Sequence, residues 1–348
     1  MSKGRVLSIQ SHVAFGYVGG KAAVFPLQCL DYDVDVVNTV NFSNHSGYGY
    51  FGGPRATATD LNAIFEVMEA NGLLKPERLL TGYIPGAEAL FTVKQRVTQL
   101  RERKPTLVYL LDPVLGDAGK LYVAADVIPI YRSMLPFSTI ITPNWFEVEV
   151  LTDTCMSDLP SLRKALRILH EEYKVPNIVI SSIPLRDWLQ ECLPENIRPS
   201  TTSDDGFLLC ISSSAENPNS RSSTIHACAV PTIPGYFSGV GDLFSALVLA
   251  HYEAITDSDI KHSPVSAAAS QALTKTHGIL SLTHEHARSL PEEERLPTDE
   301  ELDVKEPMRK IKRMRGRELR LIQGQDIIRG TKEVEFREMQ PWNGFWNP

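Results

Sequence analysis

The chain alternates short apolar runs with longer segments in which apolar residues recur every three or four positions. The short runs have the length of buried strands, at residues 5–9, 34–40, 79–81, 107–111, 139–142 and 178–181. The helical spacing falls between them, at residues 57–70, 88–101, 121–134 and 158–173. Because strands that alternate with helices form βαβ units, the pattern predicts an α/β fold with a central, mostly parallel sheet flanked by helices.

Two later segments depart from this alternation. Residues 184–224 contain many Pro, Ser and Asn residues around an apolar run at residues 207–211, which indicates a β-excursion with mobile loop tips. Residues 284–317 are charge-dense, first acidic and then basic, and predict a disordered or loosely docked insertion. The basic part fits an import signal or a patch for an acidic partner, and a solvated charged face is the alternative. Residues 318–323 then predict a strand that closes the sheet.

Composition narrows the class of partner. With 348 residues and 43% hydrophobic content, the chain can bury a large core as one large α/β domain or two ordinary ones. The net charge of −7 argues against a broad nucleic-acid surface and favours a small-molecule partner. The 5 cysteines show no paired spacing, so neither a disulfide framework nor a zinc site is expected. Since no leader and no apolar run of membrane-spanning length is apparent, we expect a soluble protein in a reducing intracellular compartment.

The most informative short motif is Gly239-Val240-Gly241-Asp242, which begins an apolar helical pattern. Glycines let the backbone approach a phosphate closely, and the free N–H groups of a helix N-terminus attract its charge. A carboxylate among such amides needs a proton or a cation, which suits a general base that activates a hydroxyl group. The motif therefore suggests phosphoryl transfer to a small alcohol. The alternative is that Asp242 only caps the helix and the glycines only shape a turn.

Further polar residues follow the predicted strands, at the sheet edge where ligands of parallel sheets bind. They are Ser11 and His12, residues 41–46, Tyr83, Asp112, residues 142–144, and Ser181 and Ser182. We expect one cleft to collect them. Residues 41–48 also combine aromatic and polar side chains that suit an aromatic ring and its substituents. His45 within this loop has the alternative of being satisfied by neighbouring backbone.

Acidic residues suggest a cation near the same edge. Asp112 and Asp117 are spaced by a turn and can hold Mg²⁺ through oxygens or water when phosphates supply the other ligands. An Asp-Pro turn with an exposed second aspartate is the alternative. Asn144 and Glu147 fit a capping box at a helix start, and Glu147 can also reach a metal-bound water. The His-x-His pair at residues 284–286 lacks further ligands, so we leave it out of the site.

In their order along the chain, these blocks resemble those of the pyridoxal kinase family within the ribokinase-like superfamily, from Arg5 to about Leu280. Residues 6–19 are similar to the start of the family's vitamin site, and residues 42–48 to its second substrate loop. The resemblance implies the substrate-binding residues Ser11, Val18, Phe42, His45, Ser46, Tyr83 and Asp242. Gly239, Val240 and Gly241 match the family's anion hole, and Asp242 matches its catalytic base.

The resemblance also implies a nucleotide site. It would contain Asp112, Asp117, Tyr122, Thr142, Asn144, Glu147, Ser181, Ser182 and Val240. Mg²⁺ and a monovalent cation, K⁺ or Na⁺, are implied near Asp112, Asp117, Thr142 and Glu147. Three features depart from the animal members: Val240 replaces a common threonine, the loop at residues 116–122 is shorter, and the C-terminal part is charged and long.

The implied protein is a single ribokinase-like three-layer sandwich over residues 1–348. Its implied activity is ATP-dependent phosphorylation of the 5′-hydroxymethyl group of pyridoxal, and also of pyridoxine and pyridoxamine, in vitamin B6 salvage. A homodimer in the cytoplasm, and also in the nucleus, is expected, without nucleic-acid or membrane partners. Two rival functions stay open: a superfamily kinase for hydroxymethylpyrimidine, a sugar or a nucleoside, and a non-catalytic protein that binds nucleotide or pyridoxal 5′-phosphate.

Overall fold

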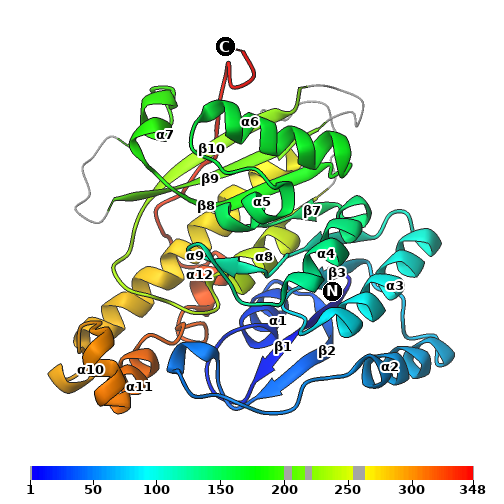
Figure 1. The fold of residues 1–348 in the computed structure, drawn as a ribbon, viewed down its shortest axis with the longest axis horizontal. Coiled ribbons are helices and arrows are strands. Elements are labelled where there is room, and N and C mark those ends of the chain that lie inside the picture. The colour runs from blue at the N-terminus through cyan, green and yellow to red at the C-terminus, as the bar shows by residue number, and fades with distance from the viewer. Residues whose placement is uncertain (1, 200–205, 216–221, 254–262, 348) are drawn as a thin grey trace.

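A nine-stranded sheet forms the centre of the molecule (Figure 1). The structure is a computed structural model that describes residues 2–199, 206–215, 222–253 and 263–347. In spatial order the strands are β11 (Gln340–Pro341), β10 (Thr224–Pro231), β9 (Phe207–Ser214), β8 (Asn177–Pro184), β7 (Ile140–Ile141), β4 (Val108–Leu111), β3 (Arg78–Thr81), β1 (Arg5–Val13) and β2 (Asp33–Phe42). The strands from β8 to β2 pair in parallel, whereas β9, β10 and β11 add antiparallel strands at one edge. The predicted mostly parallel sheet is confirmed.

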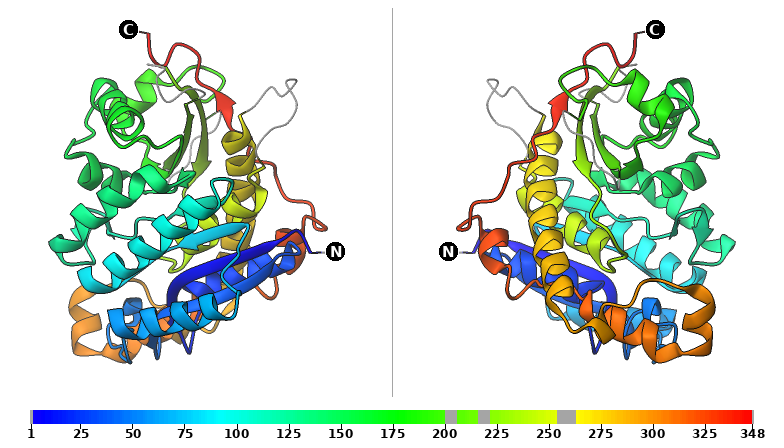
Figure 2. Two further views of the ribbon diagram at one scale, coloured as in Figure 1. Left: turned by 90° about the vertical axis from the view of Figure 1, so that its right-hand side faces the viewer. Right: turned by 90° about the vertical axis from the view of Figure 1, so that its left-hand side faces the viewer.

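Helices cover both faces of the sheet, as the two side views show (Figure 2). One face carries α2 (Ala58–Ala70), α3 (Ala87–Arg103), α4 (Ile128–Met134), α5 (Trp145–Thr152) and α6 (Leu159–Arg167). The other carries α1 (Gly20–Cys29), α8 (Val240–His251), α9 (Pro264–Ser289) and α12 (Gln325–Arg329). Successive strand side chains point to opposite faces, so Leu79 joins the first hydrophobic core and Leu80 the second. The result is the predicted three-layer sandwich.

Local sequence sets several helix starts. Thr57 and Asp158 each accept a hydrogen bond from a first-turn backbone amide, and each forms a capping box at the start of its helix. The prediction of a helix over residues 121–134 is wrong in its first half, because α4 begins only at Ile128. Leu121 instead belongs to a hairpin in which Lys120–Leu121 (β6) pairs with Gly116–Asp117 (β5).

The strand predicted at residues 318–323 is wrong. This segment forms a bend and a turn, and β11 pairs with β10 instead. The alternating apolar residues Leu319 and Leu321 are buried, but they pack in the helix-covered core beside α9 rather than in the sheet. The Arg320 amide donates to the Thr283 hydroxyl of α9 at 3.1 Å, which fixes the segment against that helix.

The prediction that residues 284–317 are disordered or loosely docked is also wrong. Helix α9 continues to Ser289, and the chain then forms α10 (Glu300–Lys305) and α11 (Pro307–Gly316). The buried side chain of Arg313 pairs with Asp303, so part of the charge lies inside the packing. Helix α11 packs against η1 (Ser46–Tyr48), a short turn in the predicted substrate loop.

The predicted β-excursion at residues 184–224 contains α7 (Asp187–Cys192) and strand β9, and it leads into β10. Both strands belong to the central sheet, as antiparallel members of its edge. Residues 200–205 and 216–221 of this excursion lie outside the described residues, so the expectation of mobile tips stays a prediction. The five cysteines, Cys29, Cys155, Cys192, Cys210 and Cys228, are free. No helix among the described residues has the length and apolarity needed to cross a membrane.

Candidate active site

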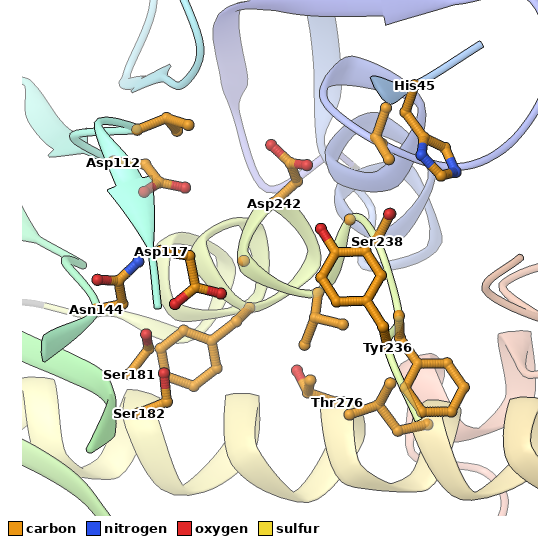
Figure 3. A pocket seen from close by; sticks show the side chains of 18 of the residues that line it. His45, Asp112, Asp117, Asn144, Ser181, Ser182, Tyr236, Ser238, Asp242 and Thr276 are labelled. Atoms are coloured by element: carbon orange, nitrogen blue, oxygen red, sulfur yellow. The ribbon is translucent and has the colours of Figure 1, made fainter. Parts of the chain in front are cut away.

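A cavity of about 690 Å³ opens where the parallel strands end (Figure 3). Every predicted site residue lines it: Ser11, Val18, Phe42, His45, Ser46, Tyr83, Asp112, Asp117, Tyr122, Thr142, Asn144, Glu147, Ser181, Ser182, Gly239, Val240, Gly241 and Asp242. The expectation of one shared cleft is confirmed in part, because the remaining strand-end residues His12, Asn41, Ser43, Asn44 and Pro143 do not line it. The His-x-His pair at residues 284–286 does not line it, as expected.

Two lining segments lie at irregularities in their strands. The register of β1 against β2 shifts between Gln10 and His12, which places Ser11 at the irregularity. The register of β8 against β9 shifts between Ile180 and Ile183, where Ser181 and Ser182 lie. Bulges redirect side chains that would otherwise alternate across the sheet, so both strands can present hydroxyl groups to the cavity.

The start of α8 holds the proposed base. Asp242 lies in the first turn of the helix, and its Oδ2 accepts a hydrogen bond from the Gly19 amide at 2.7 Å. The helix has no side-chain cap, so the alternative in which Asp242 only caps the helix is wrong. Burial raises the pKa of Asp242, and the hydrogen bond from Gly19 opposes that rise. The carboxylate is thus oriented by a backbone amide from a distant turn.

The glycines beside Asp242 have different structural reasons. Gly239 is the residue before α8 and has a φ of 81°, and a Cβ there would lie 2.0 Å from the Tyr17 carbonyl oxygen. A side chain at Gly239 is therefore excluded by conformation and by contact. A Cβ at Gly241 would meet nothing within 4 Å, so this glycine leaves open space above the helix N-terminus. Space beside free N–H groups is what an anion needs.

Asp112 is a buried acid next to this helix start. Its Oδ2 accepts a hydrogen bond from the Ser245 hydroxyl at 2.9 Å, and the Thr142 and Ser245 hydroxyls are 2.8 Å apart. Burial, and secondly the charge of Asp242, raise the pKa of Asp112 to about 8. The alternative of a simple Asp-Pro turn does not account for a residue that is 6% exposed and whose carboxylate is bonded to Ser245 of α8.

Asn144 and Glu147 form the predicted capping box at the start of α5. Oε2 of Glu147 accepts from the Asn144 amide at 2.9 Å, and Oε1 accepts from the Leu115 amide at 2.9 Å. The Asn144 side chain donates to the Gly116 carbonyl oxygen at 2.8 Å. This pair therefore holds the β5–β6 hairpin, and with it Asp117, at the rim of the cavity. Burial and the charge of Asp112 raise the pKa of Glu147.

The charge of the cavity is one-sided. Four carboxyl groups line it, from Asp112, Asp117, Glu147 and Asp242, and no Lys or Arg among the described residues does so. No group of three or more His, Cys, Asp or Glu side chains in the described ranges is arranged to hold a metal ion by itself. These acids fit a cation that takes its remaining ligands from phosphate oxygens, because few protein ligands are then required.

The opposite end of the cavity is more apolar. Val13, Val18, Val40 and Phe42 line it and pack together in one apolar cluster. Figure 3 shows the His45 ring on the far side of Asp242 from Asp112 and Asp117. Nδ1 of His45 accepts from the Gly47 amide at 3.1 Å, and Nε2 lies 3.0 Å from Oε1 of Glu318. The alternative in which neighbouring backbone satisfies His45 is thus correct for Nδ1 only.

Several lining residues were not predicted. Residues 230–238, between β10 and the glycine motif, contribute Tyr236 and Ser238, and helix α9 contributes Thr276 and His277. The Thr276 hydroxyl is buried and has no hydrogen-bond partner among the described residues. Residues 230–238 could have been found because they lead directly into Gly239. The α9 residues carried no sequence signal, since they lie far along the chain in an ordinary helical pattern.

The fold and the site define a small-molecule kinase of the ribokinase-like superfamily, with a glycine-flanked helix start and, at the cavity, an aspartate whose pKa is raised by burial. Residues 57–196 match the family model described as phosphomethylpyrimidine kinase. The chain is 36% identical over 333 residues to the pyridoxal kinase of Arabidopsis thaliana, covering 94% of this chain and 92% of the relative. It belongs to the pyridoxal kinase family.

Two further comparisons agree with this family. Identity to the human pyridoxal kinase is 33% over 310 residues, covering 86% of this chain and 92% of the relative. A solved structure of pyridoxal kinase from Leishmania donovani, in complex with ADP and pyridoxamine, is similar with a TM-score of 0.76 and 29% identity. That likeness covers 97% of this chain and 99% of the solved one. The predicted family and fold are confirmed.

Proposed function

We propose that this chain transfers the γ-phosphoryl group of ATP to the 5′-hydroxymethyl group of pyridoxal, pyridoxine and pyridoxamine, with Asp242 as the general base. The observation that carries the proposal is the position of Asp242. Its carboxylate is held by the Gly19 amide at 2.7 Å, at the start of a helix whose first turn opens into the cavity. The Leishmania relative bound to ADP and pyridoxamine supports the pair of ligands.

The vitamin ring would lie between the apolar end of the cavity and Asp242. Ser11 and Tyr83 supply polar groups beside Val18 and Phe42, so the ring can be oriented by both packing and hydrogen bonds. The free oxygen of Asp242 then accepts the proton of the vitamin hydroxyl group, as the oxygen of that hydroxyl attacks the γ-phosphorus of ATP and ADP leaves. The amides of Val240 and Gly241 lie at the helix start, where they stabilise charge on the transferring group. Because these donors belong to the backbone, Val240 can serve in place of threonine.

Asp112 and Asp117 would hold Mg²⁺, with Glu147 acting through water because its oxygens already accept backbone N–H groups. When bound, Mg²⁺ would neutralise charge on the phosphate groups. The absence of Lys and Arg from the described lining residues makes such a cation the natural partner of the phosphates. A monovalent cation, K⁺ or Na⁺, would share the acidic edge with Thr142. Asn144, Ser181, Ser182 and Tyr122 would contact the nucleotide.

A homodimer, and a location in the cytoplasm and also in the nucleus, complete the proposal. Both rest on the resemblance to the family. Light scattering of the purified protein and imaging of a tagged chain test them separately.

A second candidate substrate is hydroxymethylpyrimidine, because residues 57–196 match the phosphomethylpyrimidine kinase model. A single assay separates the substrates. The purified chain is incubated with ATP, Mg²⁺, K⁺ and equimolar pyridoxal, hydroxymethylpyrimidine, ribose and adenosine, and the phosphorylated products are identified by mass spectrometry. Pyridoxal 5′-phosphate as the main product supports the proposal. A different phosphorylated alcohol would move the substrate, and binding without any product would favour a non-catalytic role.

A further inference from the structure

One carboxylate outside the cavity joins the two loops that would contact the vitamin. Oε1 of Glu318 is 3.0 Å from Nε2 of His45 and accepts from the Tyr48 hydroxyl at 2.8 Å. Oε2 of Glu318 accepts from the Tyr17 amide at 2.8 Å. The Glu318 side chain is 12% exposed. A carboxylate this buried, with three donors of which none is Lys or Arg, is committed to the geometry of those donors.

The first oxygen of Glu318 fixes the state of the His45 ring. Since Nδ1 accepts from the Gly47 amide, the ring hydrogen belongs on Nε2, which then donates to Glu318. Both nitrogen atoms of His45 are thereby used. The ring therefore offers the cavity its carbon atoms, and the Tyr48 ring packs against it at an interplanar angle of 55°, with ring centroids 4.8 Å apart.

The second oxygen of Glu318 acts on the turn that orients the base. It holds the Tyr17 amide, and the Gly19 amide two residues later holds Asp242. The Tyr17 carbonyl oxygen is the atom that leaves no space for a side chain at Gly239. The Glu318 carboxylate therefore constrains the His45 ring on one loop. Through the Tyr17–Gly19 turn of the other loop it constrains the orientation of Asp242.

The glycines of both loops are fitted to this contact. A Cβ at Gly16 would lie 2.5 Å from Oε1 of Glu318, and Gly16 has a φ of +93°. A Cβ at Gly47 would lie 2.8 Å from the His45 ring and 3.1 Å from Cε of Met314. Side chains at these positions would displace Glu318 or the ring, so the sequence of each loop accommodates the C-terminal segment.

The segment itself is anchored on both sides of Glu318. Leu319 and Leu321 are buried in the core beside α9, and the preceding helix α11 packs against η1. The Arg317 guanidinium lies close to Gly235, whose neighbour Tyr236 lines the cavity. The charged C-terminal part of the chain thus reaches both rims of the cavity.

We propose that Glu318 is a positioning residue for the vitamin, which it acts on through His45 and the Tyr17–Gly19 turn without touching it. This proposal rests on the proposed function for the identity of the ligand. Glu318 should affect the binding of the vitamin but not that of ATP. Its contacts lie on the vitamin loops, whereas the acids and hydroxyls near Asn144 belong to the nucleotide end.

The variant Glu318→Gln tests it, because glutamine matches the shape but cannot accept from all three donors. If the glutamine oxygen faces His45 and Tyr48, its NH₂ group faces the Tyr17 amide. Both groups are then hydrogen-bond donors, and the Tyr17 N–H loses its acceptor. An unsatisfied buried donor costs enough to shift an equilibrium by about tenfold or more. We expect KM for pyridoxal, and its Kd by calorimetry without ATP, to rise about tenfold, with KM for ATP changed less than about twofold.

Two further readouts distinguish positioning from general stability. In ¹⁵N spectra of the histidine rings, the wild-type His45 signal should show the tautomer with hydrogen on Nε2, and Glu318→Gln should alter that signal. In a double-mutant cycle, Tyr48→Phe should raise KM for pyridoxal less in Glu318→Gln than in the wild type, because the Tyr48 hydroxyl of that variant donates to a neutral amide and no longer to a carboxylate. Glu335→Gln, at an exposed carboxylate that pairs with Arg337, is the matched control and should leave every readout unchanged.

Several results would overturn the proposal. A folded Glu318→Gln protein with pyridoxal Kd within about twofold of wild type would do so, as would an unchanged His45 signal. Equal increases in KM for pyridoxal and ATP with a lowered Tm would indicate a general structural role instead. If the wild type phosphorylates another alcohol and not pyridoxal, the proposed function fails, whereas the His45 tautomer still tests the link to Glu318.

Discussion

The carboxylate of Asp242 and the backbone amide of Gly19 are 2.7 Å apart, although 223 residues separate them along the chain. The amide occupies one carboxylate oxygen and leaves the other free to accept a proton. Burial raises the pKa of Asp242 and this hydrogen bond opposes the rise, so the turn at Gly19 fixes the direction of the group and moderates its basicity. The proposed base is thus oriented by a distant part of the sequence.

The substitution Asp242→Asn removes the base and keeps an acceptor. The side-chain carbonyl oxygen of the variant can still accept from the Gly19 amide, so we expect the fold and pyridoxal binding to be retained. Turnover should fall about a hundredfold or more, since a positioned general base contributes that much. Steady-state kinetics with pyridoxal, calorimetric binding and thermal melting measure the three quantities.

Asp187→Asn provides the control, because Asp187 is also in the first turn of a helix but is exposed and outside the cavity. It should keep wild-type turnover. If Asp242→Asn retains turnover within about tenfold of the wild type, another group takes the proton and the assignment of the base is wrong.

Gly19→Ala should disturb the orientation of Asp242 without replacing any polar side chain. Gly19 has a φ of 54°, and a Cβ there would lie 2.1 Å from Oγ of Ser11 and 2.3 Å from its carbonyl oxygen. The turn must move, and its amide should leave Asp242. We expect kcat to fall about tenfold or more, since a loss of about 1.4 kcal/mol from a hydrogen bond to a charged group corresponds to that factor.

The matched control is Gly86→Ala. Gly86 also has a positive φ, of 80°, at a helix start, but a Cβ there would meet nothing within 4 Å. It separates the cost of backbone strain from the effect of the contact. Equal losses of kcat in the two variants would show that strain alone, and not the Gly19–Asp242 bond, lowers activity.

Much of the fold could be predicted because its signals are local. Apolar runs placed the parallel strands, and Asn144 with Glu147 marked the start of α5 by the spacing of a capping box. The site followed from topology, since polar residues after parallel strands must meet at one edge of the sheet. The family resemblance then added residues such as Val18 and Tyr122, whose types alone would not have singled them out.

The errors arose where packing decides between equal local patterns. Leu319 and Leu321 alternate as in a strand, yet both are buried beside α9, and the segment turns instead of pairing. A prediction from composition places charged residues at the surface, so it could not reveal that Arg313 is buried against Asp303. The contact of His45 with Glu318 spans 273 residues and has no local signal at either end.

The packed state of the charged segment can be tested at Asp303. This carboxylate binds Arg313 and lies 3.9 Å from Nε of Arg309, and the Asp303 and Arg313 side chains are 9% and 5% exposed. Asp303→Asn leaves Arg313 without its charge partner, which is costly for a buried cation. We expect amide hydrogen exchange in α10 and α11 to become about tenfold faster or more, which corresponds to about 1.4 kcal/mol of local stability.

Glu301→Gln, at an exposed position of α10, is the control for a lost acidic charge and should leave exchange unchanged. Fast exchange throughout α10 and α11 in the wild-type protein would contradict the packed arrangement and would restore the disordered insertion predicted from composition.

The pH dependence of stability can be tested at Asp112. Its pKa is raised to about 8, first by burial and then by Asp242, whereas an unfolded aspartate ionises near about 4. Between these pH values the folded protein keeps a proton that the unfolded chain releases. The stabilising effect is therefore complete below about pH 4 and is lost as pH rises through about 8, with a slope of up to about 1.4 kcal/mol per pH unit.

Asp112→Asn cannot ionise, so its free energy of unfolding should fall less steeply between about pH 5 and 8 than that of the wild type, measured by urea denaturation in EDTA at about four pH values. Some slope should remain, because burial and Asp112 also raise the pKa of Glu147, and the first of these causes persists in the variant. Asp326→Asn, at an exposed aspartate in α12, should keep the wild-type slope. If Asp112→Asn and the wild type lose stability equally over this range, Asp112 is ionised in the folded protein and its carboxylate must be compensated by a group other than a proton.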